Sequence, residues 1–329
     1  MSQSSSMDNT PPSGFTAGLR KGCSLGVRRG IHGFIWIAKI LVPVSLAVAL
    51  LEWTGWLHAL DPVFSPAMAL INLPPQAALP IIAALFSSYY AAVAMMVAIP
   101  FTHAQFALLA VFISICHMVV VEGLIQHKAG INGAVITAMR FAAACVAVYI
   151  ASQFLHDTAT SVPVPMALEE HIYIVDTLLA WALSTLALLL KIVLIIVPVM
   201  IILESLKALG YTDRIAAVFR PFMSLLGLSP NVATMWVTGT FFGLIYGSAV
   251  IVEESTSGRF SEDELTRLHI SLGMSHSLVE DPALFLALGI GLQWTVVPRL
   301  LAAASSVHAY RLARSLSIRF RAAPQEEAL

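Results

Sequence analysis

Long apolar stretches alternate with short polar ones along almost the whole chain. Several of them approach the roughly 20 residues that an α-helix needs to cross the hydrocarbon core of a bilayer. They are too long and too uniformly apolar for the alternating strands of a membrane β-barrel, so the pattern predicts helices. The apolar runs cover residues 31–51, 76–100, 104–126, 131–155, 178–203, 232–252 and 283–305.

The composition indicates an integral membrane protein, because 58% of the 329 residues are hydrophobic and only 11% are charged. The mean hydropathy is +0.83. The net charge of −1 provides no basic field that would attract nucleic acid. We therefore expect the partners to be the lipid bilayer and a small polar solute or cation, with no nucleic acid. Assembly into a homo-oligomer, or with a membrane partner protein, is also compatible with the sequence.

The motifs do not predict an enzyme. The sequence has no G-x-x-x-x-G-K-[ST] phosphate-binding loop, and no nucleophile is convincingly paired with a base. We therefore expect no catalytic residue and assign no resident cofactor, and we consider a divalent metal ion only as a substrate.

Rare residues recur along the chain at a slowly rising spacing, which predicts an internal repeat with short insertions. The spacing is first 152 residues, then 155 and finally 159. The matched pairs are Lys39 with Lys191, Glu52 with Glu204, Asp61 with Asp213, Pro66 with Pro221, Met68 with Met223, Pro75 with Pro230, Phe86 with Phe241, Phe101 with Phe260, His117 with His276, and Glu122 with Asp281.

The placement of charge predicts that the second half is inverted relative to the first. Both ends of the chain carry clusters of Arg, whereas residues 155–177 hold four acidic residues and no Lys or Arg. Because basic flanks stay in the cytoplasm, both termini should be cytoplasmic and the midpoint external. Each half then needs an odd number of crossings, although it shows about four apolar segments. One segment in each half should therefore fail to cross.

The expected non-crossing segments are residues 73–95 and 228–250, which match each other in the repeat. Both open with proline, and the second is interrupted by Gly239, Gly243 and Gly247. Corresponding Gly/Pro-interrupted segments in two inverted halves are the usual sequence indication of a transporter's binding site. Glycines four residues apart also permit close helix packing, and that alternative stays open.

These patterns predict an all-α polytopic membrane protein built from two inverted repeats, each with about three crossing helices and one re-entrant or broken helix. The expected divisions are a disordered cytoplasmic N-terminus over residues 1–30, repeat 1 over 31–155, an external linker over 156–177, repeat 2 over 178–310, and a cytoplasmic tail over 311–329.

Three ionisable residues, His276, Glu280 and Asp281, interrupt the apolar sequence near the end of the second half. Such groups are costly inside a bilayer and usually face a cavity or a partner. His276 and Glu280 are four residues apart, so a continuous helix would place them on one face. Pro282 disfavours a helical conformation at Asp281, which makes Asp281 a candidate helix N-cap. An internal hydrogen-bonded pair of His276 and Glu280 is the structural alternative to a binding site.

The first half supplies a second polar set, His117 and Glu122, through the repeat. Imidazole and carboxylate groups from both halves could meet in one central cavity, where they would suit a first-row divalent metal or carry protons. His276 and Glu280 are the predicted metal ligands. Glu253 follows the Gly-interrupted segment and is a candidate ligand at its mouth. It also fits an ordinary solvated loop before a capping box at Ser261 and Glu264.

The stretch "FFGLIYGSAVIVEES…GRFSEDELTRLHISLGMSHSLVEDPALFLALG" resembles the nucleoside-recognition or Gate domain of bacterial membrane proteins. Spore maturation proteins, the membrane half of the ferrous-iron transporter FeoB and, more distantly, concentrative nucleoside transporters share this resemblance. It covers residues 241–289, and the repeat extends it over 39–126. It implies a multi-pass protein of the bacterial cytoplasmic (inner) membrane. The chain departs from FeoB because it lacks a GTPase domain.

Two classes of function fit these observations. The first is a transporter or permease that moves a small polar solute through a midplane site between inverted repeats, with Gly243 and Gly247 at the cavity. Within this class we expect a divalent cation, because carboxylates and imidazoles outnumber the amide groups expected for a nucleoside. A nucleoside transporter is the alternative within the class. The second class is a non-transporting assembly or partner protein of the spore-maturation type.

Overall fold

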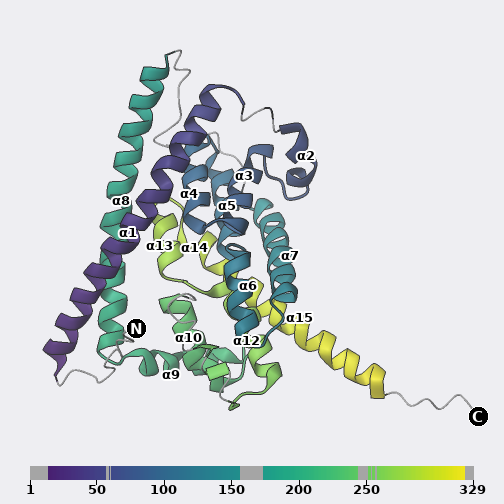
Figure 1. Ribbon diagram of the computed structural model, residues 1–329. Helices are drawn as coiled ribbons and strands as arrows, with labels where there is room; N and C mark the ends of the chain where they lie inside the picture. Colours follow the sequence, from purple (N-terminus) through teal and green to yellow (C-terminus); the bar gives the residue numbers. More distant parts are fainter. Residues whose placement is uncertain are drawn as a thin grey trace, which may run out of the picture.

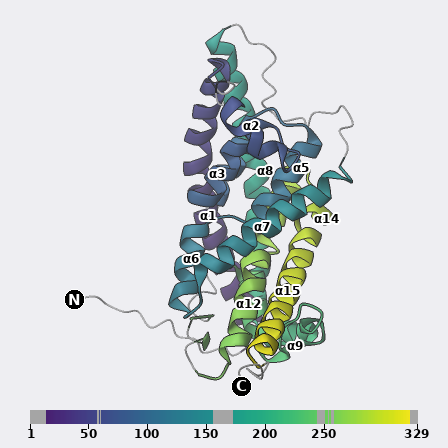
Figure 2. The ribbon, with the colours of Figure 1, turned by 90° about the vertical axis from the view of Figure 1, so that its right-hand side faces the viewer.

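The computed structural model describes residues 14–56, 59, 61–155, 173–243, 251–252, 254–255 and 258–322, which form helices and turns with no β-strand among them (Figures 1 and 2). The fold is all-α, as the apolar runs predict. The first half contains α1 (Phe15–Trp53), α2 (Asp61–Ala69), η2 (Pro75–Ala77), α3 (Ala78–Phe86), α4 (Tyr89–Ala98), α5 (His103–Ile115), α6 (Val119–Lys128) and α7 (Gly133–Ser152). The second half contains α8 (Ile174–Ala208), α9 (Thr212–Met223), η3 (Pro230–Val232), α10 (Ala233–Phe242), α12 (Glu262–Ser275), α13 (Glu280–Ala287), α14 (Leu292–Thr295) and α15 (Val297–Ala322).

The two halves repeat the same local structures, which confirms the internal repeat. Helix α5 begins with a capping box formed by Thr102 and Gln105. Helix α12 begins with a capping box formed by Ser261 and Glu264, which the sequence predicts. After each of these helices one residue adopts a left-handed conformation, Met118 in the first half and Ser277 in the second.

Helices α1 and α8 pack against each other in opposite directions and cross at a shallow angle (Figure 1). Three glycines of α1, spaced four residues apart, make the closest approach. Added Cβ atoms on Gly22 and Gly26 would overlap the backbone of Ser205 and Ile201, and one on Gly30 would lie 2.9 Å from the Cα of Val197. Small residues at this spacing let membrane helices approach closely.

The close contact at these glycines leads to a prediction about stability. Gly26→Leu should destabilise the protein by about 3 kcal/mol, because the new side chain has no space against the α8 backbone and the two helices must separate. Gly33→Leu is the matched control on the same helix, since an added Cβ at Gly33 meets no atom within 4 Å. Thermal unfolding in detergent measures both variants. Equal melting temperatures for the two would contradict the α1–α8 packing.

The ends of the membrane repeats differ from the expected divisions. Helix α1 starts at Phe15, so residues 15–30 are helical and not disordered, because packing against α8 involves Gly22, Gly26 and Gly30. Helix α15 likewise continues to Ala322, past the expected boundary at residue 310.

The expected break in residues 73–95 is present. The apolar run forms two short helices, α3 and α4, that pack against each other and are separated at Ser87 and Ser88. The hydroxyl of Ser88 accepts a hydrogen bond from the amide of Ala91 and so caps α4. In the second half, α10 ends at the matching place, where Gly243 has a φ of 79°.

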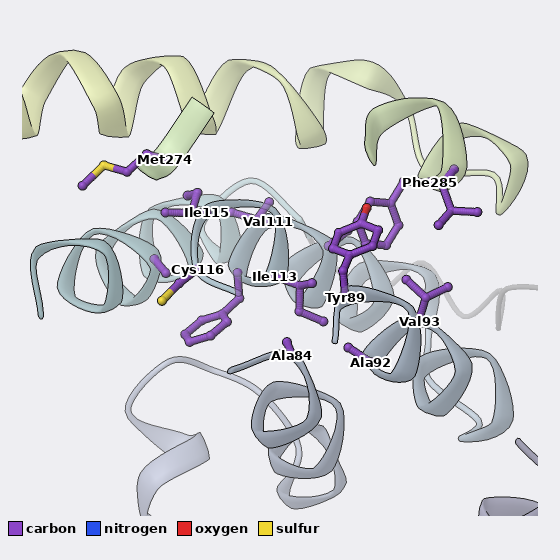
Figure 3. Close-up of a cluster of buried hydrophobic side chains, with 14 of the residues drawn as sticks. Ala84, Tyr89, Ala92, Val93, Val111, Ile113, Ile115, Cys116, Met274 and Phe285 are labelled. Carbon is purple, nitrogen blue, oxygen red and sulfur yellow. The ribbon is translucent and has the colours of Figure 1, made fainter. Parts of the chain in front are cut away.

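A second break, which the sequence analysis does not anticipate, divides the run over residues 104–126 into α5 and α6 at residues 116–118. Helix α5 lies in the centre of the molecule, and every residue from Phe106 to Ile115 is buried. Figure 3 shows Ile113, Ile115 and Cys116 at the end of this helix in the buried cluster that also holds Tyr89 and Phe285. The two breaks bring helix ends into the protein interior.

Within the described residues, four segments are long and apolar enough to cross a membrane by length and composition: Phe15–Leu51, His103–Lys128, which contains the break between α5 and α6, Gly133–Ser152 and Ile174–Ala208. Large apolar side chains on α1, α7 and α8 are exposed, as expected for surfaces that face lipid.

Candidate cation-binding site

Two histidines, one from each half, meet where the central helices break. His117 follows the end of α5, and His276 caps the end of α12. Their Nε2 atoms are 3.1 Å apart, and the two side chains are almost fully buried. The repeat therefore brings together the two histidines that the sequence analysis singles out.

The backbone determines which nitrogen of each ring is free. The Nδ1 atom of His117 lies 2.8 Å from the carbonyl oxygen of Ile113, and that of His276 lies 2.9 Å from the carbonyl oxygen of Leu272. A carbonyl oxygen only accepts, so each Nδ1 carries the hydrogen and each Nε2 of a neutral ring is a bare acceptor. Two facing acceptors need a proton or another cation between them.

A carboxylate from α6 completes this arrangement. The Oε1 atom of Glu122 lies 3.4 Å from Nε2 of His276 and 3.8 Å from Nε2 of His117. Asp281 is close as well, because ligand atoms of His117, His276 and Asp281 all lie within 4.8 Å of one another. Both sequence-predicted acids of the repeat pair are thus at the site.

Two buried arginines hold the site in place, one from each half. Arg140 of α7 donates from Nε to the carbonyl of Ile115 at 3.2 Å and from Nη2 to that of His117 at 3.1 Å, and its Nη1 lies 2.7 Å from Oε2 of Glu122. These bonds satisfy carbonyls exposed by the helix break. They also give the buried carboxylate a cationic partner, without which its burial would be strongly unfavourable.

Arg299 of α15 repeats this pattern in the second half. Its Nε donates to the carbonyl of Met274 at 3.0 Å, its Nη2 donates to that of His276, and its Nη1 lies 3.2 Å from Oδ2 of Asp281. Neither arginine is among the residues predicted from the sequence. The signal was available, because Arg140 and Arg299 are 159 residues apart, the same spacing as the two histidines.

The arrangement can bind a cation. Two arginines balance two carboxylates, so the two imidazoles add neutral nitrogen donors to a site without excess positive charge. Two ligands of a metal with bonds of about 2.1 Å are separated by roughly 3.0–3.4 Å at ordinary coordination angles. The 3.1 Å between the two Nε2 atoms falls in that range. Imidazole with carboxylate is a ligand set that suits first-row divalent metals.

Glu280 is not placed as the sequence analysis expects. Helix α12 ends at Ser275, and Ser277 has a φ of 55°, so His276 and Glu280 do not share a helix face. The Oε1 atom of Glu280 instead accepts a hydrogen bond of 2.8 Å from the hydroxyl of Tyr90. Among the described ion pairs, none joins Glu280 to a histidine.

The N-cap expected at Asp281 is also wrong. Helix α13 begins at Glu280 with Val279 as its N-cap, and Asp281 lies in the first turn. Proline is tolerated in the first turn, so Pro282 does not prevent this conformation. The carboxylate of Asp281 accepts a hydrogen bond from Arg299 and does not cap the helix.

Two tyrosines of α4, which the sequence analysis missed, lie against the site. The ring of Tyr89 packs edge-on against His117 with centroids 5.2 Å apart, and its hydroxyl donates to the carbonyl of Asp281 at 3.2 Å. Tyr90 binds Glu280. Both tyrosines directly follow Ser88 in the broken segment. That position next to the break is the sequence feature that could have indicated them.

The remaining predicted site residues lie in the Gly-interrupted segment or directly after it. Gly243 ends α10 beside the site, where an added Cβ would lie 3.0 Å from Oγ of Ser277. Gly247 and Glu253 lie outside the described residues, so their proposed places at the cavity stay predictions.

Comparison with known proteins identifies the family of the chain. A family model for the Gate domain, described as nucleoside recognition, matches residues 189–303, which include His276, Asp281 and Arg299. The uncharacterized membrane protein YvoD of Bacillus subtilis (strain 168) is 30% identical over 268 residues, which cover 80% of this chain and 86% of YvoD. This chain belongs to the Gate-domain family of membrane proteins. No solved structure matches it.

Membership of the Gate-domain family indicates a transporter-like role in a membrane. The matched Gate region holds one histidine, one acid and one arginine of the site. Their counterparts His117 and Arg140 belong to the first half of this Gate-family chain, where the internal repeat identifies them.

Proposed function

We propose that this Gate-family membrane protein is a permease that moves a divalent first-row metal cation through the site between its two halves. The observation that carries the proposal is the pair of bare Nε2 atoms 3.1 Å apart, with the carboxylate of Glu122 beside them. A neutral polar solute such as a nucleoside would need both donors and acceptors, whereas these three groups only accept.

The position of the site supports transport. It is formed at the breaks of α5 and α12, and the tips of α3 and α10 reach the same breaks. The amide of Met118 donates to the carbonyl of Ala84 at 2.7 Å, and that of Leu278 donates to the carbonyl of Thr240 at 2.7 Å. Broken helices from inverted halves are the usual frame of a transporter's midplane site, where small movements of one half open it to one side.

The proposed location is the bacterial inner membrane with both termini in the cytoplasm. The basic flanks support this orientation, and α1 begins and α15 ends at the same end of the molecule (Figure 1). In a background without native cysteines, Thr54→Cys should react with an impermeant maleimide in intact cells, and Asp213→Cys should not. Both positions are exposed. Labelling of Asp213→Cys without labelling of Thr54→Cys would contradict this orientation and indicate the opposite one.

Flux in liposomes tests the proposed activity. Purified protein, with any affinity tag removed, should carry Zn²⁺, Mn²⁺ or Fe²⁺ into vesicles that contain a metal-sensitive dye. His276→Ala should reduce this flux at least tenfold. His32→Ala is the matched control, because His32 lies exposed on α1. Uptake of a nucleoside with no metal flux would contradict the proposal and favour the nucleoside alternative.

A further inference from the structure

Three arginines line an open cavity between the start of α12 and the later part of α15, away from the central site. The two helices lie side by side (Figure 2). The cavity has a volume of about 660 Å³, within the range of roughly 300–1,000 Å³ that is usual for small-molecule sites. Arg267 of α12 and Arg311 and Arg314 of α15 line it together with a single acid, Asp263.

The acid holds two of the arginines in place and leaves the third without a partner. Oδ2 of Asp263 lies 2.6 Å from Nη2 of Arg267, and its Oδ1 accepts a hydrogen bond from Arg314. Arg267 also donates from Nη1 to the carbonyl of Gly227 at 3.3 Å. Among the described residues, Arg311 has no hydrogen bond or ion pair. A guanidinium group has five N–H donors, so many of them stay available in the cavity.

The cavity therefore has an excess of positive charge. Three arginines and one carboxylate give its lining a net charge of +2. The other acids of the first turn of α12, Glu262 and Glu264, do not line the cavity. The carboxylate of Glu264 accepts hydrogen bonds from the amide and the hydroxyl of Ser261 in the capping box. The lining thus fits an anion.

The position of the cavity along α15 places it at the level of the lipid headgroups. Arg311 and Arg314 follow Arg299 of the central site by 12 and 15 residues on this helix, which is roughly 18 and 22 Å along its axis. These are upper limits for the depth, because α15 is inclined to α8 (Figure 1). Half of the hydrocarbon core of a bilayer is about 15 Å thick. With the central site near the midplane, both arginines lie where lipid phosphates begin.

Helix α9 independently marks a membrane surface at this level. It lies across the end of α8 (Figure 1), and it carries Arg214 and Arg220. Phe222 and Leu225, at its end and directly after it, are 54% and 71% exposed. Exposed apolar side chains beside arginines are typical of a helix that lies in the membrane interface. The cavity is at the same level, because the carbonyl oxygen of Leu225 lies 3.1 Å from Nε2 of its lining residue His308.

We propose that this cavity binds the headgroup phosphate of an anionic phospholipid. Guanidinium groups present paired N–H donors that match phosphate oxygens, and basic pockets at the headgroup level attract anionic lipids. Leu312, which also lines the cavity and is 62% exposed, offers an apolar surface to the acyl chains. A phosphate held by Arg267 and Arg311 joins α12 to α15, the helices that carry His276 and Arg299. The inference goes beyond the proposed transport, since it needs no metal ion.

Lipid titration tests this site. The full chain, purified in a neutral detergent, is titrated with fluorescently labelled phosphatidylglycerol, and phosphatidylcholine should bind at least tenfold more weakly. Arg311→Gln should weaken phosphatidylglycerol binding at least fivefold. Ser315→Asp should do the same, because the new acid in the lining can pair with Arg311 one helical turn earlier. Arg220→Gln is the matched control, since Arg220 is exposed on α9 outside the cavity, and it should change the affinity less than twofold.

Three results would overturn the site. Equal losses in Arg311→Gln and Arg220→Gln would mean a general attraction to a basic surface. Equal binding of the two lipids by the wild type would mean that no anionic headgroup is recognised. Inorganic phosphate that displaces the labelled lipid better than chloride at equal ionic strength would assign the cavity to a free phosphate.

Two controls separate this inference from folding and from the proposed function. Without lipid, Arg311→Gln should melt at the wild-type temperature, because Arg311 has no partner among the described residues. Its Zn²⁺ affinity should also equal that of the wild type. A loss of lipid binding in this variant therefore supports the lipid site whether or not the central site binds a metal.

Discussion

Arg140→Met should destabilise the protein by about 3–5 kcal/mol, because it leaves the carboxylate of Glu122 buried without its cation. The substitution also frees the carbonyls of Ile115 and His117, which the guanidinium group satisfies at the break after α5. Methionine fills much of the space and is tolerated in apolar surroundings, so the loss reports mainly on charge and hydrogen bonding. Denaturant unfolding in detergent micelles measures the change.

Two comparisons make this prediction specific. Arg259→Met is the surface control, because Arg259 pairs with Glu254 at an exposed place and its side chain is 65% exposed. It should have a much smaller effect. Adding Glu122→Gln to Arg140→Met should recover part of the loss, since no charge is then left unpaired. A double variant as unstable as the sum of the single variants would contradict the pairing of these two residues.

The second large effect is on Zn²⁺ affinity, and it should distinguish the two glutamates near the site, Glu122 and Glu280. Glu122→Gln should weaken Zn²⁺ binding at least tenfold, because the amide keeps the size of the side chain and removes the charge beside both histidines. Glu280→Gln should bind Zn²⁺ like the wild type. Its side chain is held by Tyr90, and the amide oxygen of glutamine can accept the same hydrogen bond.

Binding and stability have to be measured on the same samples, since Glu122 also pairs with Arg140. Calorimetric titration with Zn²⁺ and a thermal melt provide the two quantities. A Glu122→Gln sample that is less stable but binds Zn²⁺ with wild-type affinity would mean that this carboxylate is structural. Loss of Zn²⁺ binding in Glu280→Gln, with binding kept in Glu122→Gln, would mean that Glu280 is the metal ligand, as predicted from the sequence.

Much of the fold follows from local patterns in the sequence. The apolar runs mark the helices, and the 159-residue spacing that relates His117 to His276 also relates two capping boxes and two left-handed turns. These features depend on a few neighbouring residues, so the repeat carries them from one half to the other. The paired histidines were found for the same reason.

The rest of the site depends on contacts between helices distant in the sequence. The break after Ser275 separates His276 from Glu280, although their spacing fits one helix face. The true acidic neighbour of His276 is Glu122, which comes from the other half of the chain. Spacing within one segment cannot reveal such a partner. Arg140 and Arg299 do have a sequence signal, the shared spacing of 159 residues, but only the structure shows which acid each one pairs with.

The central claim is that one histidine from each half binds the same ion. Zinc X-ray absorption with one equivalent of Zn²⁺ tests it most directly, because the spectrum counts the imidazole ligands of the tightly bound ion. The account predicts two imidazole nitrogens at about 2.0–2.1 Å in the wild type. In either His117→Ala or His276→Ala, only one such nitrogen should remain on any Zn²⁺ still bound. A wild-type spectrum with fewer than two imidazoles, or one unchanged by both substitutions, would contradict the claim.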